Sequence, residues 1–403
     1  GLAAALEAKK NGAKTIIIER ENRVGGILKQ CIHDGFGLVR FGEKLSGPEY
    51  AERYIKMVKE NNIPIMTSTF ASNVEKIDSG FKLSLVNDKG VLDIKSKTLV
   101  LANGCRERSS RQVNIHGTRP AGIYTAGTAQ YFVNINGYLP CKKCVILGSG
   151  DIGLIMARRL TLEGTKVIGV FEAKSTPSGL SRNIVQCLND YSIPLYLSQT
   201  VTKVFGQDRV EAVEISNVDK KMQPIKGTEK IIKCDGIILS VGLIPENEIA
   251  EVLKIKIDNS TKGPLVDNNF MTTQEGIFSC GNALHVNDLV DYVSESGKLA
   301  GKNAAIYSKE KINRTLIPIN RSKEFLYVVP QYINVDNESD EIIIYFRARE
   351  VFKNKMVFVK CGDKVLFKKK YMNLKPPEME RIKINLDSLQ LENSEIQIFM
   401  EEG

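Results

Sequence analysis

The sequence of 403 residues predicts an α/β fold made of two strand–glycine turn–helix units and a terminal all-β segment. Three observations indicate this fold. A GxGxxG motif at 148–153 stands between an apolar run and a helical pattern. The chain opens on what looks like the end of a second such unit, and short strand patterns without glycine motifs begin after about residue 319.

The first residues have the pattern of a helix followed by a strand. Residues 1–14 place apolar side chains at helical spacing, and residues 15–19 form an apolar strand that ends in Glu19. Gly1 then corresponds to the third glycine of a dinucleotide-binding fingerprint, and Glu19 to its ribose-binding acid. This interpretation predicts a chain that is N-terminally truncated. The alternative is an amphipathic helix that happens to begin with glycine.

The mid-chain motif has the full context of a dinucleotide site. An apolar strand leads into Gly148, Gly150 and Gly153, a helical pattern follows, and a second strand ends at Glu172 about twenty residues on. The glycines permit a tight turn, close approach of a pyrophosphate and close helix packing, and the helix N-terminus favours phosphates. Glu172 is expected to bind ribose hydroxyls, which favours NAD(H) over NADP(H), although the nearby Lys174 reduces this preference.

The composition excludes several classes of protein. Of the residues, 42% are apolar, but no long uncharged apolar run is present, so no membrane span is predicted. The net charge of +9 is spread among acids, with 368–370 as the one short lysine run, and indicates a solvated surface rather than a nucleic-acid site. The eight scattered cysteines fit reduced thiols in the cytoplasm.

Six segments occur in a fixed order along the chain. They are Gly1 with Glu19, Gly25 with Gly26, 99–104, 148–153, 240–245 and 276–282. This ordered set resembles the FAD-dependent pyridine nucleotide-disulfide oxidoreductases, which have two Rossmann-like dinucleotide-binding domains. The resemblance covers about residues 1–318. It implies an FAD-binding domain at 1–116 and 270–318 with an NAD(P)-binding domain inserted at 117–269, and it leaves 320–403 as a C-terminal β domain of sandwich type.

The resemblance also implies the cofactor contacts. FAD is expected at Gly1, Glu19, Gly25, Gly26, Gly104, Gly281 and Asn282, and NAD(H) at Gly148, Gly150, Gly153 and Glu172. Asn282 departs from the family, which usually has an aspartate that contacts the flavin ribityl chain. Asparagine can still donate and accept a hydrogen bond there, so FAD binding is expected with a different local charge.

The redox dithiol of the family is missing at both of its usual positions. The thioredoxin reductase type places CxxC before the second fingerprint, where 125–128 contain no thiol, and the glutathione reductase type places CxxxxC after the first Gly–Gly, where only Cys31 occurs. A CxxC does occur at Cys141 and Cys144, directly before the fingerprint strand. A structural role is favoured for this pair. A disulfide reductase that uses it is the alternative, and zinc is disfavoured because a second ligand pair at a suitable spacing is not evident.

Two further stretches indicate a narrower subgroup. Residues 103–108 and 120–130 resemble subunits of hydrogen cyanide synthase, opine oxidase and sarcosine oxidase. Residues 30–38 and the tail resemble a bacterial flavoprotein associated with a glycerol-3-phosphate dehydrogenase-like flavoprotein. Such subunits imply an oligomer with a partner flavoprotein and a small cysteine-rich protein. The prediction is an FAD-dependent pyridine nucleotide oxidoreductase that transfers electrons between subunits; a non-catalytic assembly subunit is the alternative, hinted at by Asn282.

Two histidines are candidate catalytic residues. His33 follows Gly25–Gly26 and His285 follows Asn282, so both are expected to border the flavin, where either could act as general acid or base. His285 could instead hydrogen-bond the backbone.

The tail carries enough aromatic side chains for a core of its own. They are Tyr327, Tyr332, Tyr345, Phe346, Phe352, Phe358 and Phe367. Two roles are equally compatible with this pattern: a stabilising cap on the flavin domain, or a docking module for a partner subunit.

Overall fold

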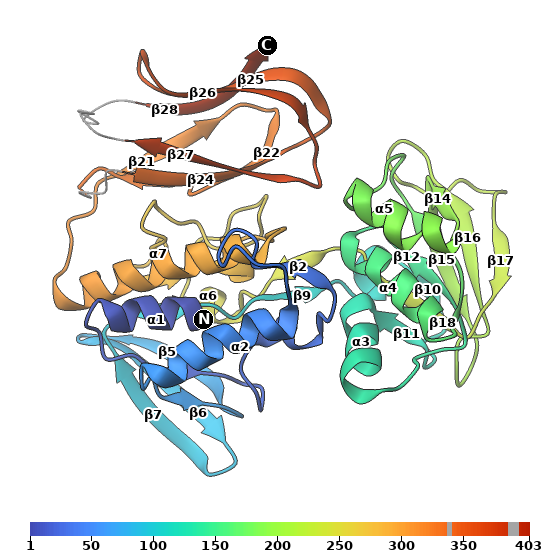
Figure 1. Cartoon of the computed structure of the whole chain (residues 1–403), viewed down its shortest axis with the longest axis horizontal. Coiled ribbons are helices and arrows are strands. Elements are labelled where there is room, and N and C mark those ends of the chain that lie inside the picture. The colour runs from blue at the N-terminus through green and yellow to red at the C-terminus, as the bar shows by residue number, and fades with distance from the viewer. Residues whose placement is uncertain (337–340, 386–394) are drawn as a thin grey trace. The chain divides into compact units, whose positions relative to one another are not determined.

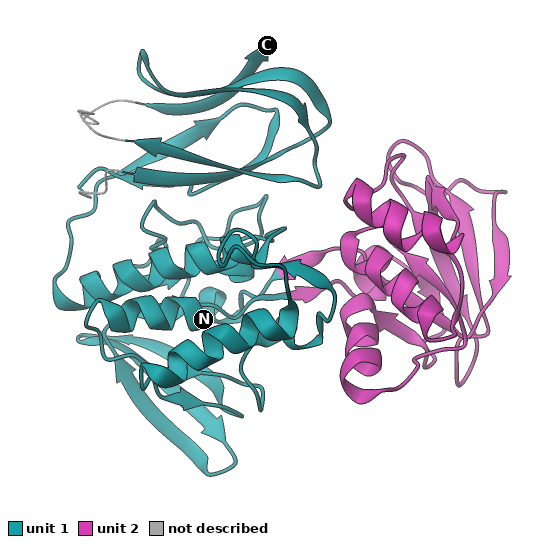
Figure 2. Cartoon of the chain, viewed as in Figure 1, with its two compact units in different colours: residues 1–105, 245–403 teal, residues 106–244 magenta. Residues whose placement is uncertain are grey.

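A computed structural model describes residues 1–336, 341–385 and 395–403. The chain divides into two compact units, residues 1–105 with 245–403 and residues 106–244 (Figure 2). Strands β9 (Cys105–Glu107) and β19 (Leu243–Pro245) carry the chain into and out of the second unit and pair with each other. Among the described helices, none combines the length and the apolar character that crossing a bilayer requires.

The second unit is a Rossmann-like domain (Figure 1). Its five-stranded parallel sheet has the order β11-β18-β12-β13-β14, and a four-stranded sheet has the order β10-β15-β16-β17. Side chains of β12 alternate between two cores: Val145 and Leu147 face the four-stranded sheet, whereas Ile146 faces the helices. The elements are β10 (His116–Gly117), β11 (Ile123–Thr125), α3 (Ala126–Tyr131), η3 (Phe132–Asn136), β12 (Lys143–Leu147), α4 (Asp151–Leu162), β13 (Lys166–Glu172), α5 (Ser181–Cys187), η4 (Asn189–Tyr191), β14 (Leu195–Leu197), β15 (Gln199–Phe205), β16 (Ala212–Asn217), β17 (Lys230–Lys233) and β18 (Gly236–Leu239).

The first unit begins with a layer of helices over short strands. This unit contains the parallel pairs β1-β4 and β8-β20 and the antiparallel sheet β5-β6-β7. Figure 1 shows β5, β6 and β7 on one side of α1, with α7 on the other. Helix α1 packs closely on α7, because Gly301 of α7 has no side chain. A Cβ at this position would overlap the Ala4 carbonyl oxygen of α1. The elements are α1 (Leu2–Lys10), β1 (Ile17–Ile18), η1 (Gly26–Gln30), β2 (Asp34–Phe36), β3 (Leu45–Ser46), α2 (Gly47–Glu60), β4 (Ile65–Met66), β5 (Phe70–Ile77), β6 (Gly80–Asn87), β7 (Gly90–Ser96), β8 (Leu99–Leu101), η2 (Ser110–Val113, in the second unit), α6 (Glu248–Val252), β20 (Ile277–Ser279), η5 (Gly281–Ala283) and α7 (Val290–Lys309).

The C-terminal strands form two packed sheets. The five-stranded sheet β23-β21-β28-β25-β26 and the three-stranded sheet β22-β24-β27 enclose a core that includes Val357, Ile344 and Ile398. The other face of the three-stranded sheet packs on α7 and its neighbours through Tyr327 and Tyr345. The strands are β21 (Leu316–Arg321), β22 (Phe325–Val329), β23 (Tyr332–Asn334), β24 (Glu341–Ala348), β25 (Phe352–Cys361), β26 (Lys364–Leu374), β27 (Met379–Asn385) and β28 (Ile396–Glu402).

The predicted fold class is confirmed, and the expected domain boundaries differ from those of the compact units. The inserted unit spans 106–244 rather than 117–269. Residues 245–257 belong to the first unit because Ala250 and Ile255 are buried in one core with Val74 and Leu85 of the β5-β6-β7 sheet. The 320–403 segment has its own core yet groups with the first unit through its contacts on α7.

Candidate functional site

The mid-chain glycine turn lies at the carboxyl end of β12, where α4 begins. At Gly148 the backbone φ is +95°, and a Cβ there would overlap the Ser240 carbonyl oxygen. A Cβ at Gly153 would lie 2.7 Å from the Cβ of Ser240. At Gly150 the nearest atom to a Cβ would be the Ser240 hydroxyl oxygen at 3.4 Å. Packing therefore requires the first and third glycines, whereas the second has room beside it, where the sequence predicts the pyrophosphate.

Glu172 closes the same turn from the end of β13. Its side chain is buried, and Oε2 accepts hydrogen bonds from the Ser149 backbone N–H (3.0 Å) and hydroxyl (2.6 Å). Oε1 accepts from the Lys174 backbone N–H at 3.0 Å. These bonds fix a carboxylate against the glycine loop, at the position where the sequence predicts the ribose.

Two polar side chains that the sequence did not single out complete the turn. The Ser149 hydroxyl also accepts from the Ser178 N–H at 2.9 Å, and Asp151 Oδ1 accepts from the Leu180 N–H at 2.9 Å. The segment after Glu172 is thereby attached to the start of α4. In the sequence, this role of Ser149 and Asp151 is indicated only by their positions inside the GxGxxG motif.

The residues predicted to bind FAD lie on several segments of the first unit. Gly1 caps α1, and a Cβ on it would meet only the Ala102 Cβ, at 3.7 Å. Glu19 directly follows β1, and its Oε1 accepts from the Glu21 N–H at 3.0 Å. Gly26 and Gly104 have φ of +56° and +74°, and a Cβ at either would meet nothing within 4 Å. Three of these glycines therefore leave space that a nucleotide can fill.

Gly25 and Gly281 are more confined. Gly25 has φ +113°, and a Cβ there would lie 3.3 Å from the Ala51 Cβ. Gly281 has φ +61°, a Cβ would lie 2.9 Å from the Val293 side chain, and its N–H donates to the Ser296 hydroxyl at 3.0 Å. Both residues shape the loops rather than open space in them.

Asn282 is held by its own loop. Its Oδ1 accepts from the Asn287 backbone N–H at 3.0 Å, and its Nδ2 lies 3.6 Å from the Cys105 sulfur. A carboxylate could accept the first bond but could not donate toward the thiol. The amide thus fits its immediate surroundings, and an amide edge can also serve a ribityl hydroxyl.

The structure does not bring the two predicted catalytic histidines together in an open pocket. His33 is half-buried on its loop, with Nδ1 at 3.2 Å from the Asp34 carbonyl oxygen and its ring against Phe36. His285 is fully buried between Tyr327 and Tyr345 of the C-terminal domain.

The surroundings of His285 do not favour an acid–base role. Among the described residues neither ring nitrogen has a hydrogen-bond partner of normal geometry. Burial, with the Arg347 guanidinium adding to it, lowers the pKa of His285 to about 3, against a smaller opposing effect of the Val286 backbone. The ring is neutral at physiological pH, and its place is in the interface with the C-terminal domain.

The Cys141 and Cys144 thiols lie in the interior of the second unit. Both side chains are buried, and their hydrogen bond, together with burial, raises the pKa of Cys144 well above its ordinary value. No two cysteines form a disulfide in the described part of the chain. Within the same residues, no group of three or more His, Cys, Asp or Glu is placed to hold a metal ion.

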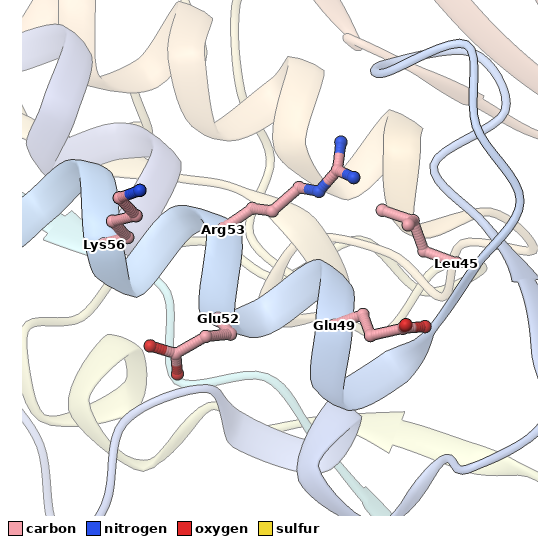
Figure 3. A pocket seen from close by; sticks show the side chains of 5 residues that line it. All are labelled: Leu45, Glu49, Glu52, Arg53 and Lys56. Atoms are coloured by element: carbon pink, nitrogen blue, oxygen red, sulfur yellow. The ribbon is translucent and has the colours of Figure 1, made fainter.

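A hollow lies on α2 in the first unit (Figure 3). It is lined by Leu45, Glu49, Glu52, Arg53 and Lys56. Arg53 binds Glu43 with two hydrogen bonds of 2.8 and 2.6 Å, and Glu49 caps its own helix through Ser46. The charges of Arg53 and Glu49 therefore already have partners.

The glycine turn with its acid in one unit and the open glycines in the other agree with a flavin-linked pyridine nucleotide oxidoreductase, the class that the family match shows. The chain belongs to the pyridine nucleotide-disulphide oxidoreductase family, whose profile matches residues 1–312. The match ends before the C-terminal strands.

Relatives of the chain include components of larger enzymes. It is 24% identical over 294 residues to hydrogen cyanide synthase subunit HcnB of Pseudomonas protegens, covering 66% of this chain and 59% of HcnB. It is 26% identical over 326 residues to an alkyl hydroperoxide reductase subunit of Staphylococcus epidermidis, covering 77% of this chain and 57% of that relative. The chain therefore spans less than two thirds of the length of these relatives.

Solved structures show the same fold. Thioredoxin reductase of T. acidophilum superposes with a TM-score of 0.61 at 19% identity and covers 77% of this chain and 95% of its own. A NAD-dependent persulfide reductase from A. fulgidus has a TM-score of 0.57 at 17% identity, and the match covers 96% of this chain and 70% of that one.

Proposed function

We propose that the protein is an NAD(H)-linked, FAD-dependent electron-transfer subunit that passes electrons to or from a partner flavoprotein. The observation that carries the proposal is the paired set of cradles, one at Gly150 in the second unit and one at Gly26 and Gly104 in the first. Bound FAD would supply the redox chemistry with the nicotinamide and with a second acceptor. The protein's part is to hold both nucleotides and to admit the partner.

Residues of the first unit would hold FAD and those of the second NAD(H). Gly1 and the N-terminus of α1, with Glu19, Gly25, Gly26 and Gly104, would bind the flavin's dinucleotide part, and Gly281 and Asn282 its ribityl chain. NAD(H) is favoured over NADP(H) because the buried Glu172 carboxylate would repel a 2′-phosphate.

An exposed apolar segment supports a protein partner. Ile27, Ile32, Leu38 and Val39 are 59, 44, 54 and 66% exposed, and they flank His33 in the sequence that follows Gly25–Gly26. Apolar side chains gathered on one exposed loop typically mark an interaction site. HcnB and the alkyl hydroperoxide reductase relative are both named as subunits, which agrees with an assembly containing a partner flavoprotein and a small cysteine-rich protein. His33 is the remaining candidate acid–base residue there.

The compartment proposed is the cytoplasm. Most of the thiols lie in the interior, and the described residues contain no disulfide. Both observations agree with a reducing environment.

The nucleotide assignment is tested by the rate at which NADH and NADPH reduce the bound flavin. We expect NADH to be preferred, and Glu172→Gln to reduce this preference by about tenfold, since it removes the repelling charge. The matched control is Glu163→Gln, at the exposed C-terminus of α4. An unchanged preference in Glu172→Gln would contradict the assignment. A flavin that neither nucleotide reduces would favour a non-catalytic assembly subunit.

The disulfide reductase alternative rests on Cys141 and Cys144. Their burial predicts that a double change to Ala leaves flavin reduction by NADH and reduction of any disulfide substrate unaltered, because the attacking thiolate must reach its substrate. Loss of disulfide turnover in a folded double variant would establish this alternative.

A further inference from the structure

The outer face of the five-stranded sheet carries an unusual group of side chains. Phe358 of β25 and Phe399 of β28 stack with ring centroids 5.3 Å apart and planes 11° apart. The Lys360 ammonium lies 5.1 Å from the Phe399 centroid, and that of Lys368 5.2 Å from the Phe358 centroid. Lys370 opposes Met356, two residues from Phe358, and therefore lies on the same face. We call Phe358, Phe399, Lys360, Lys368 and Lys370 the lysine–phenylalanine face.

Positive charge is concentrated on this part of the domain. The hairpin of β25 and β26 contains seven lysines and a single acid, Asp363. Lys360, Lys368 and Lys370 form no ion pair with any described residue, whereas Lys355 and Lys383 pair with Glu402 and Glu341. The sheet thus gathers cations whose counter-charges are not supplied by the described chain.

The same cations border an open strand edge. Strand β26 is last in the sheet order and, within the described residues, pairs with β25 alone. Val365 and Met372 on it are 48 and 63% exposed. An eleven-residue edge strand offers backbone N–H and C=O groups to an added strand, and such edges are used for peptide recognition.

The opposite face of the domain is already occupied. The three-stranded sheet lies between α7 and the five-stranded sheet (Figure 1). Arg381 and the Tyr345 hydroxyl bind Glu295 of α7, and Arg347 binds Asp288 at 2.6 Å. One side of the domain is therefore a cap on the flavin unit, and the lysine–phenylalanine face is the side left for a partner.

We propose that the lysine–phenylalanine face and the β26 edge bind an extended acidic segment of a partner protein. The proposal deepens the proposed function, since that partner is the second subunit. Alternating acids on an added strand would reach Lys360, Lys368 and Lys370, and its backbone would pair with β26. Single-stranded nucleic acid fits less well, because the two rings stack on each other and Phe358 is only 9% exposed, which leaves little ring face for a base.

The test is binding of a labelled peptide of about ten residues in which Glu and Val alternate, measured by fluorescence anisotropy with the full chain. We expect salt-sensitive binding that the triple variant K360E/K368E/K370E weakens by about tenfold or more. The matched control is K220E/K221E/K226E, which makes the same charge change at exposed sites of the second unit. Slower amide exchange in β26 on peptide addition is expected as well.

Three results would overturn the proposal. The first is that the triple variant and the native protein bind the peptide with equal affinity. The second is that the control variant loses as much peptide affinity as the triple variant. The third is that an oligothymidylate of similar length binds more tightly than the acidic peptide. Flavin reduction by NADH is measured on the same samples. It should be unchanged in the triple variant, so a failure of docking and a failure of the proposed redox function are distinguishable.

Discussion

The two dinucleotide turns differ in what keeps their glycines free of side chains. In the second unit, Gly148 and Gly153 are packed against Ser240 of the neighbouring strand end, and the protein itself excludes a Cβ. In the first unit, Gly26 and Gly104 face open space. Packing within the protein thus requires glycine at these two positions of the second unit, whereas at Gly26 and Gly104 only the positive φ angles favour it. Substitution of a packed glycine should therefore lower stability, and substitution of an open glycine should mainly affect cofactor binding.

The largest expected effect is that of Gly148→Ala. The new Cβ overlaps backbone at Ser240 and the residue is held at φ +95°, so we expect the second unit to lose about 3 kcal/mol or more of stability. The loss of stability is measured by thermal unfolding, with amide exchange in β12 as the local probe. Gly164→Ala is the control, because Gly164 has φ +89° with nothing within 4 Å and should lose only about 1 kcal/mol. Equal losses would remove the distinction between packed and open glycines.

The first unit has a packed position of its own, His285. Its folded pKa of about 3 lies below the ordinary 6.5, so the unfolded chain takes up the proton first and stability is lost as pH falls from 6.5 toward 3. His285→Phe abolishes this dependence. We compare the stability of the variant with that of the native protein at each pH. When the pH falls from 8 to 5, this difference should shift by about 2 kcal/mol in favour of the variant. Denaturant unfolding at the two pH values measures it, and parallel curves would show that His285 is not buried as described.

Gly150→Ala should separate binding from folding in the second unit. Its backbone is extended and the nearest atom to a Cβ is 3.4 Å away, so stability should remain within about 0.5 kcal/mol of the native value. The added methyl group enters the pyrophosphate cradle, and NADH affinity should fall by about tenfold. Nucleotide titration measures the affinity. Unaltered affinity would place the pyrophosphate elsewhere.

Gly104→Ala should lose about 1 kcal/mol of stability, because the φ angle at this residue is +74°. Its main expected consequence is reduced flavin retention during purification, read from the absorption spectrum. Gly42→Ala, at φ +68° and equally open, carries the same strain outside the predicted flavin contacts and serves as control. Similar flavin content in the two variants would argue against the assignment of Gly104.

Local patterns predicted the local parts of the fold. The strand, turn and helix around Gly148 and the acid at Glu172 follow from spacing within about 25 residues, and the structure reproduces them. Features set by distant residues were missed. Residues 245–257 have no motif that shows their packing on the β5-β6-β7 sheet, and nothing near His285 indicates that Tyr327 and Tyr345 enclose it.

The insertion of one unit within the other has a consequence for synthesis of the chain. Strand β8 pairs with β20, and the whole second unit is translated between them. At typical rates of about 5–20 residues per second, β8 waits roughly ten to thirty seconds for its partner. The second unit can fold in that interval, and the pairing of β9 with β19 then brings the two connections together. Folding of the inserted unit shortens the loop that the flavin unit must close and so lowers its entropic cost.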